Sequence, residues 1–303
     1  MIGGVWVPLI TPFRDGLIDL LSYRRLIEHA IAAGASGLFP LGTTGESPTL
    51  DDAEIDAIMA ETVDAVAGRV PVFVGIGGNA THKVIRTIKR AERFGFFGIV
   101  SVCPYYNRPT QDGLRAHFTA ISEATDRQIL IYNIPYRTSV NLANDSVLRL
   151  AELANIVGIK DSSGNIAQSL MLLADKPAGF SVLTGEDHLF FPLLCSGADG
   201  GILAASHLMT DRFVAIARLV AANDHQAARA VWTPLQQLMA RLFEEANPMP
   251  LKHCLWRQGL IASPECRLPL TSISTGLRDD LDRWVQRNSQ LGDPCPSHLR
   301  LHL

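Results

Sequence analysis

The chain has few cysteines, and their positions fit neither a disulfide framework nor a metal site. The 303 residues contain five cysteines: Cys103, Cys195, Cys254, Cys266 and Cys295. Their number is odd, they are widely separated, and no two of them have the CxxC spacing of a zinc or redox motif. Such a pattern is typical of reduced thiols, so we expect a cytoplasmic protein without a bound metal.

Long hydrophobic runs and blocks of like charge are also lacking. No apolar run approaches the roughly 18 residues of a membrane span, and the apolar start of the chain is interrupted by Pro8 and Pro12. The formal net charge is only -3, without a basic cluster, whereas nucleic acids and anionic membranes attract basic surfaces. We therefore expect no targeting or spanning segment, no nucleic acid and no membrane as partner, and a small-molecule ligand.

Three common catalytic motifs are absent. The sequence contains no GxSxG, no HExxH and no GxxxxGK[ST], which gives no support to a serine hydrolase, a zincin or a P-loop enzyme. The segment Gly75-Ile76-Gly77-Gly78-Asn79-Ala80 matches the GxGxxA form of the dinucleotide fingerprint. The acidic residue that would bind the ribose about 20 residues later is missing. A nicotinamide oxidoreductase is thus an alternative with weak support.

The main pattern that is present is a regular alternation of short apolar runs with segments of helical period. We predict strands at 5–11, 37–41, 70–76, 98–102, 129–134, 157–160, 181–184 and 200–204. The intervening segments predicted as helices include 20–33, 51–67, 81–94, 111–124 and 146–153, with Ser22 and Asn144 as N-caps. Eight strand-helix units predict an α/β fold, the (β/α)8 TIM barrel, and favour it over a doubly wound sheet, which usually needs fewer strands.

The strand pattern stops after residue 205, and the rest of the chain is predicted to be helical. The helical segments are 211–222, 226–245, 251–258 and 275–287, and 290–303 has no clear period. We expect a catalytic barrel over residues 1–222 and a C-terminal helical appendage with a tail over residues 223–303.

Polar side chains follow several predicted strands, where a barrel of this type has its active site. Lys160 closes the apolar run 156–159, so burial would disfavour its ammonium form and leave a neutral amine able to attack a carbonyl. Tyr132 closes another apolar run, and its phenol could move a proton. The alternatives are a lysine that reaches solvent or pairs with Asp161, and a tyrosine packed at the rim.

Other candidates are weaker when each is taken alone. The turn 42–47 contains two glycines and two threonines and could hold a carboxylate or phosphate through backbone N–H groups. The planar guanidinium of Arg137 could bind a carboxylate through two hydrogen bonds. The alternative is that Arg137 forms an ion pair at the surface. His188 and His207 follow the last two predicted strands, where a single histidine is more often structural.

Together these segments resemble a known family, the pyruvate-dependent class I lyases and aldolases that include dihydrodipicolinate synthase and N-acetylneuraminate lyase. The resemblance rests on Gly42-Thr43-Thr44-Gly45-Glu46-Ser47, Pro104-Tyr105-Tyr106-Asn107, Tyr132-Asn133-Ile134-Pro135 with Arg137-Thr138, Gly158-Ile159-Lys160, and Asn247-Pro248 with Pro250 and Lys252. The motifs occur in the family's order over most of the chain, and several are most similar to its synthase branch.

The resemblance implies roles for individual residues. Lys160 would form a Schiff base with pyruvate, while Tyr132, Thr43 and Tyr106 would form a proton relay. Tyr106 would come from a neighbouring subunit, which requires at least a dimer and is expected in a homotetramer built as a dimer of dimers.

The remaining implied roles concern binding. Thr44 and the backbone around Ile202 would hold the pyruvate carboxylate, and Arg137 would bind the carboxylate of the aldehyde substrate. No metal or dissociable cofactor is needed, because the iminium itself eases removal of a pyruvate methyl proton.

The implied reaction is condensation of pyruvate with L-aspartate 4-semialdehyde to 4-hydroxy-tetrahydrodipicolinate, in lysine and diaminopimelate biosynthesis. Leu203 and His207 stand where the synthases usually have serine and asparagine, and residues 158–164 resemble the aldolase and lyase members. A sibling aldolase or lyase acting on a sugar acid or hydroxy-oxo acid is therefore the alternative. A noncatalytic pyruvate sensor is a further one.

The regulatory site of the family is altered in the sequence. Asp52 and Ile55 replace histidines and Lys83 replaces a glutamate of the lysine-binding site in feedback-regulated synthases. Because the Lys83 cation would repel the ammonium of a lysine ligand, we expect weak or absent inhibition by lysine. Half-inhibition by submillimolar lysine would contradict this.

Overall fold

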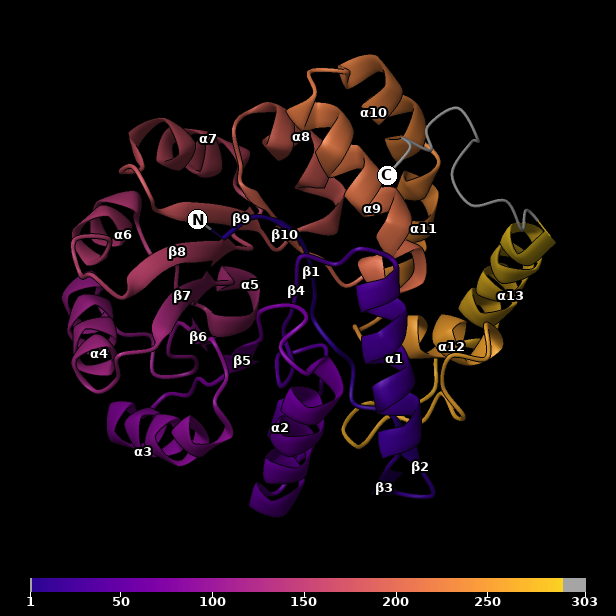
Figure 1. Ribbon diagram of the computed structural model, residues 1–303, viewed down its shortest axis with the longest axis horizontal. Helices are drawn as coiled ribbons and strands as arrows, with labels where there is room; N and C mark the ends of the chain where they lie inside the picture. The colour runs from indigo at the N-terminus through magenta and orange to yellow at the C-terminus, as the bar shows by residue number, and fades with distance from the viewer. Residues whose placement is uncertain (1, 291–303) are drawn as a thin grey trace.

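The computed structural model describes residues 2–290, and its centre is a ring of parallel strands (Figure 1). The strands of the ring are β1 (Gly4–Val7), β4 (Gly37–Leu38), β5 (Phe73–Gly75), β6 (Gly98–Val102), β7 (Gln128–Asn133), β8 (Ile156–Asp161), β9 (Ser181–Thr184) and β10 (Gly200–Ile202). Their order in the sheet is β4-β1-β10-β9-β8-β7-β6-β5. A parallel bridge between Leu38 and Val72 joins the two end strands and closes the ring. The predicted (β/α)8 barrel is confirmed.

Helices surround the strands on the outside of the barrel (Figure 1). They are α1 (Leu20–Ala32), α2 (Asp52–Val66), α3 (Thr81–Ala91), α4 (Gln111–Glu123), α6 (Asn144–Leu150), α7 (Ile166–Asp175), α8 (Phe190–Cys195) and α9 (Ser206–Ala221), whereas the short helix α5 (Pro135–Thr138) follows β7 at the carboxyl end of the barrel. Shorter elements are the hairpin β2 (Phe13–Arg14) with β3 (Leu17–Ile18), and the 3-10 turns η1 (Ser47–Thr49), η2 (Glu92–Phe94) and η3 (Asp187–Leu189). The sequence did not predict the hairpin or helices α5, α7 and α8.

Two predicted N-caps are wrong. The cap of α1 is Asp19, which accepts from the backbone N–H and the hydroxyl of Ser22, so Ser22 lies inside the first turn. The cap position of α6 is Ala143, and Asn144 is its first helical residue. In both cases, the residue predicted as the cap lies inside the helix.

The predicted helix 226–245 is also wrong, because the structure divides it. It consists of α10 (His225–Trp232) and α11 (Leu235–Leu242), and Pro234 lies between them. Proline has no N–H for the helical hydrogen bond, and its ring clashes with the preceding turn, so a continuous helix is disfavoured there.

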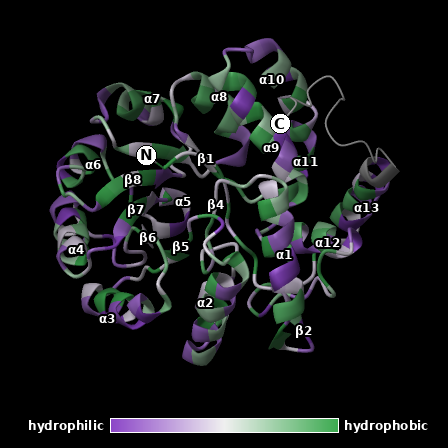
Figure 2. Cartoon of the chain, viewed as in Figure 1, coloured by the Kyte–Doolittle hydropathy of each residue, from purple (hydrophilic) through white to green (hydrophobic). Residues whose placement is uncertain are grey.

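The core has two parts, one inside the barrel and one between the barrel and its helices. Inward side chains such as Trp6, Phe73 and Leu130 fill the lumen, whereas the alternating outward positions pack against the helices. Gly37 faces the Trp6 ring, and a Cβ atom there would collide with it. Figure 2 shows the same division, with hydrophobic residues in the strands and hydrophilic residues on outward helix faces.

The C-terminal helices α10 to α13 gather on one side of the barrel (Figure 1). Besides α10 and α11 they are α12 (Met249–Arg257) and α13 (Thr275–Gln290). The predicted division after residue 222 falls in the turn between α9 and α10 and stays a prediction. Cys295 and the predicted tail from 291 lie outside the described residues. In the part that is described, no helix is both long and apolar enough to cross a membrane.

Candidate active site

The structure brings six of the seven predicted site residues together at the carboxyl ends of the strands. They line a small cavity of 30 Å³, to which Pro8, Tyr136, Gly185, Asp187, Ala204, Phe243 and Asn247 also contribute. The six are Thr43 and Thr44 after β4, Tyr132 in β7, Arg137 in α5, Lys160 in β8 and Ile202 in β10. The seventh, Tyr106, lies outside this cavity in the chain described and is 88% exposed.

Lys160 points into the barrel and is buried. Its Nζ lies 4.1 Å from the centroid of the Tyr132 ring and 5.2 Å from that of Phe39. Burial lowers the pKa of Lys160 to about 8, although Asp187 and Glu186 partly oppose this shift. About a tenth of the amine is therefore neutral at pH 7, far more than for a lysine in water, and nucleophilic attack requires this neutral form.

Gly185 provides the space that the lysine side chain occupies. A Cβ atom at this position would lie 2.6 Å from Lys160 Cε and would also collide with Ser162 Oγ. Any side chain at residue 185 would therefore displace the Lys160 side chain.

Tyr132 is buried beside the lysine, with its phenol between polar groups. Burial raises the pKa of Tyr132 to about 12, while the hydroxyls of Ser162 and Thr43 and the positive charge of Arg137 act in the opposite direction. The phenol is protonated at neutral pH and can donate a hydrogen bond to an oxygen atom of a molecule bound at Lys160. It is therefore suited to passing a proton between neighbouring groups.

The loop after β4 that carries Thr43 and Thr44 is held by the C-terminal part of the chain. Asn247 Nδ2 donates to Thr44 Oγ1 over 2.9 Å. Lys252 in α12 forms an ion pair with Glu46, and both side chains are fully buried, at 0% and 1% exposure. The sequence pattern contained Asn247 and Lys252, but it did not show that their side chains reach this loop.

Two acidic residues after β9 complete the surroundings of Lys160. Asp187 accepts hydrogen bonds from the backbone N–H groups of Ala204, at 3.3 Å, and Ala205, at 2.6 Å. Burial raises the pKa of Asp187 to about 6 and that of Glu186 to about 7. The sequence showed that both carboxyl groups follow a strand, but it indicated no role for them.

The two candidate histidines have different surroundings. His207 is buried, donates from Nδ1 to the Ala204 carbonyl and accepts at Nε2 from the Ile10 N–H. Burial lowers the pKa of His207 to about 4, so the ring is neutral and connects the ends of two barrel strands. His188 is exposed, with Nδ1 3.8 Å from Glu186 Oε2.

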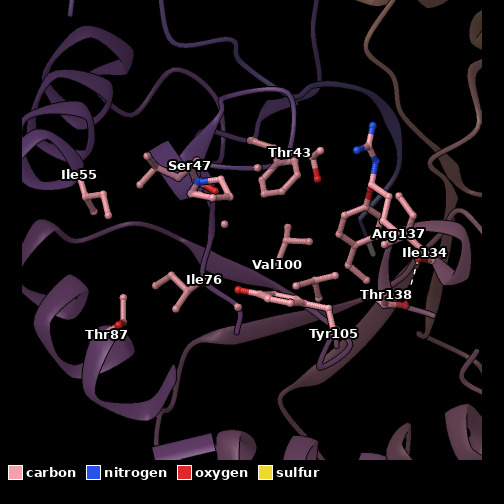
Figure 3. A pocket seen from close by; sticks show the side chains of 18 of the residues that line it. Thr43, Ser47, Ile55, Ile76, Thr87, Val100, Tyr105, Ile134, Arg137 and Thr138 are labelled. Carbon is pink, nitrogen blue, oxygen red and sulfur yellow. Dashed lines mark hydrogen bonds between the residues drawn. The ribbon is translucent and has the colours of Figure 1, made fainter. Parts of the chain in front are cut away.

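A larger cavity of 440 Å³ adjoins the small one and shares Thr43, Tyr132 and Arg137 with it. Figure 3 shows Ile55, Ile76, Val100 and Thr87 on its mostly apolar wall and the Tyr105 hydroxyl directed towards Ile76.

Of the residues expected to alter lysine binding, Ile55 lines this larger cavity. Asp52 pairs with Arg90 over 2.8 Å, and Lys83 is exposed. The expected insensitivity to lysine stays a prediction. Over the described range 2–290, no three His, Cys, Asp or Glu side chains are placed to hold a metal ion.

Comparison with known proteins gives consistent matches over nearly the whole chain. Residues 1–288 match the model of the Dihydrodipicolinate synthetase family. The chain is 47% identical over 284 residues to 4-hydroxy-tetrahydrodipicolinate synthase 2 of Clostridium acetobutylicum, covering 94% of this chain and 99% of the relative. The crystal structure of dihydrodipicolinate synthase from Thermotoga maritima has a TM-score of 0.92 at 39% identity, covering 96% and 99%. A chloride-inhibited dihydrodipicolinate synthase from Acinetobacter baumannii, complexed with pyruvate, has a TM-score of 0.92 at 35% identity, covering 96% and 99%.

Proposed function

This chain belongs to the dihydrodipicolinate synthetase family, and from that membership we propose that it is a Schiff-base lyase that condenses pyruvate with L-aspartate 4-semialdehyde. The product would be 4-hydroxy-tetrahydrodipicolinate, the compound named in the printed names of its relatives. The single observation that carries the chemistry is the buried Lys160, held beside a protonated phenol in a small cavity that adjoins a larger one of 440 Å³.

The first stage is formation of the imine. The neutral amine of Lys160 adds to the C2 carbonyl of pyruvate, and the carbinolamine hydroxyl takes up the proton that the lysine ammonium had given up and leaves as water, which gives an iminium. Thr44 and the backbone at Ile202 lie on the cavity wall, where they can hold the pyruvate carboxylate. The Asn247 contact fixes the Thr44 hydroxyl for this role.

The second stage forms the carbon-carbon bond. The pyruvate methyl group gives a proton to the phenol oxygen of Tyr132 as the phenol passes its own proton to Thr43, and the resulting enamine attacks the aldehyde carbon. The proton passes to the aldehyde oxygen, so the relay ends in its starting state. Arg137 at the cavity mouth binds the carboxylate of the aldehyde, and attack of that substrate's amine on C2 closes the ring and frees Lys160.

We further propose a homotetramer, a dimer of dimers, in the cytoplasm. Tyr106 is 88% exposed on the loop after β6, as expected of a side chain that enters a neighbouring subunit. A separate apolar face on α7, formed by Ile166, Leu170 and Met171, is also exposed and could provide the second contact. The four cysteines in the described residues are free thiols, in accord with a reducing compartment.

Borohydride reduction in the presence of pyruvate tests the imine. Intact mass should show one reduced pyruvate adduct per chain on the wild type and none on Lys160→Ala. Lys83→Ala, which removes an exposed lysine, is the matched control and should react like the wild type. A wild-type protein without an adduct would exclude the whole class of pyruvate lyases.

A second assay separates the synthase from its siblings. The protein is given pyruvate and L-aspartate 4-semialdehyde, and the product is detected with a coupled reductase. Cleavage of sugar acids and hydroxy-oxo acids is measured in parallel. Turnover of only the latter substrates would replace the synthase proposal with the sibling aldolase.

A further inference from the structure

Two buried polar atoms beside Lys160 have no hydrogen-bond partner within the described residues. They are Ser162 Oγ and Glu186 Oε1. Ser162 follows Lys160 by two positions, so its side chain projects to the same side of the chain. The Lys160 and Ser162 side chains both border Gly185, where a Cβ atom would meet Lys160 Cε and Ser162 Oγ. The serine hydroxyl therefore lies directly beside the stem of the nucleophile.

Ser162 also connects two ionisable groups. Its hydroxyl lowers the pKa of Tyr132 and that of Glu186, because it offers a hydrogen bond to the charged form of each. A hydroxyl has one donor and two acceptor positions, so it can accept from the phenol and donate to the carboxylate at the same time. Neither contact is formed as a hydrogen bond in the described residues, so the unpartnered Ser162 hydroxyl is placed to connect Tyr132 and Glu186 when a proton moves.

We propose that Glu186, acting through Ser162 and Tyr132, holds the proton exchanged during imine formation. The inference rests on the proposed function and adds to it. The Lys160 ammonium transfers its proton to the Glu186 carboxylate, and the neutral amine adds to C2 of pyruvate. The Glu186 carboxyl then returns the proton to the carbinolamine hydroxyl, which leaves as water. The added nitrogen passes one of its protons to the former carbonyl oxygen before that oxygen leaves, so the C=O bond is replaced by the iminium C=N bond, one water is released, and Glu186 ends as the carboxylate from which it started.

The charges around Glu186 favour this exchange. Burial and then the neighbouring Asp187 raise the pKa of Glu186 to about 7, while Lys160 opposes the shift. This value lies close to the pKa of about 8 for Lys160, so one proton can be shared between the two groups. The titratable groups facing Glu186 are Lys160, Asp161, Asp187, His188, Tyr132 and Tyr136.

The pH profile of imine formation distinguishes this role from a structural one. The productive state has a neutral Lys160 and a protonated Glu186. It is depleted below pH 7, where the lysine is charged, and above pH 8, where the carboxyl has lost its proton. The wild type should therefore give a bell-shaped rate profile with its maximum between these values.

The experiment measures the single-turnover rate of imine formation with pyruvate, by rapid mixing, borohydride quench and intact mass. Ser162→Ala and Glu186→Gln should each slow the reaction about 10- to 100-fold at pH 7.5 and remove the alkaline limb of the profile. Ser163→Ala is the matched control and should keep the bell shape. Glu186→Ala should regain rate with added formate, whereas Ser162→Ala should not.

Four outcomes would contradict one of the two proposals, and they can be told apart. A wild-type profile that only rises with pH, or a Ser162→Ala variant with the wild-type rate and profile, would overturn the proton-holding role. Loss of rate in Glu186→Ala without rescue by formate would also count against it. Absence of any pyruvate adduct on the wild type would instead contradict the proposed function itself.

Discussion

At the scale of single residues, the reactivity of this site comes from burying groups that water would otherwise keep charged. Lys160 lies among the aromatic rings of Tyr132 and Phe39, and this desolvation is what lowers its pKa. The same burial destabilises the folded protein wherever the lysine remains charged. In its proposed role as nucleophile, Lys160 therefore lowers the stability of the protein while it supplies the reactive amine.

We predict that Lys160→Met makes the protein more stable at pH 7. The folded-state pKa of about 8 lies below the model-peptide value of 10.5, so the unfolded chain binds the proton more tightly. The wild type should gain roughly 3 kcal/mol as pH rises from 8 to 10.5. The variant lacks this gain, so its advantage is largest below pH 8 and disappears above 10.5.

Urea unfolding of both proteins at pH 7 and pH 10 measures the effect. Lys83→Met, which changes an exposed lysine, should unfold like the wild type at both values. A Lys160→Met variant less stable than the wild type at pH 7 would show that the lysine is stabilising in its charged form.

At the scale of elements, helix α12 holds the loop that carries Thr43 and Thr44. The Lys252 ammonium, which also donates to the Glu265 carbonyl over 2.8 Å, pairs with Glu46 in this loop. The second Glu46 oxygen accepts from the Arg267 N–H over 3.0 Å. The C-terminal helices thereby fix the threonines of the cavity, although only Phe243 and Asn247 from that region line it.

We predict that Lys252→Met destabilises the protein by about 3–5 kcal/mol, because it leaves the Glu46 carboxylate buried without its cation. The double variant with Glu46→Gln should recover a large part of this loss. Thermal or urea unfolding gives the stabilities, and the yield of the pyruvate adduct reports on the loop. Equal stability of the single and double variants would show that the two side chains are not coupled.

At the scale of the whole molecule, one proposed catalytic residue is separated from the others. Tyr106 is exposed on the loop after β6, whereas Tyr132 and Lys160 are buried at the cavity. Its backbone has a φ of 73°, in the left-handed region that residues other than glycine seldom adopt. A strained and exposed tyrosine beside an active site fits a role across a subunit interface.

We predict that two inactive variants complement each other. If Tyr106 acts in trans, a mixed dimer of Lys160→Ala and Tyr106→Phe protomers contains one site with both side chains intact. Random pairing should then restore about a quarter of the wild-type activity, since half the dimers are mixed and half their sites are complete. Coexpression followed by the coupled assay tests this. An inactive mixture of folded proteins would place Tyr106 in its own subunit's site.

The sequence alone determined the fold and identified most of the candidate site residues, because both depend on local patterns. Strands predicted at 98–102 and 181–184 match β6 and β9 in full, since period and β-branched content follow from adjacent residues. Lys160 and Tyr132 could be identified as candidates because each closes an apolar run, and strands of a parallel barrel end on the same face.

Only the tertiary structure decided which distant groups meet. Nothing in the sequence shows that Lys252 pairs with Glu46 or that Asn247 reaches Thr44, because these contacts join segments more than 200 positions apart. The caps of α1 and α6 and the break at Pro234 depend on backbone geometry that side-chain patterns specify weakly. Ser162 and Glu186 gain their proposed role from desolvation in a closed barrel. Burial and long-range proximity exist only once the chain has folded. They therefore decided which candidate side chains lie together at the cavity and which groups surround them.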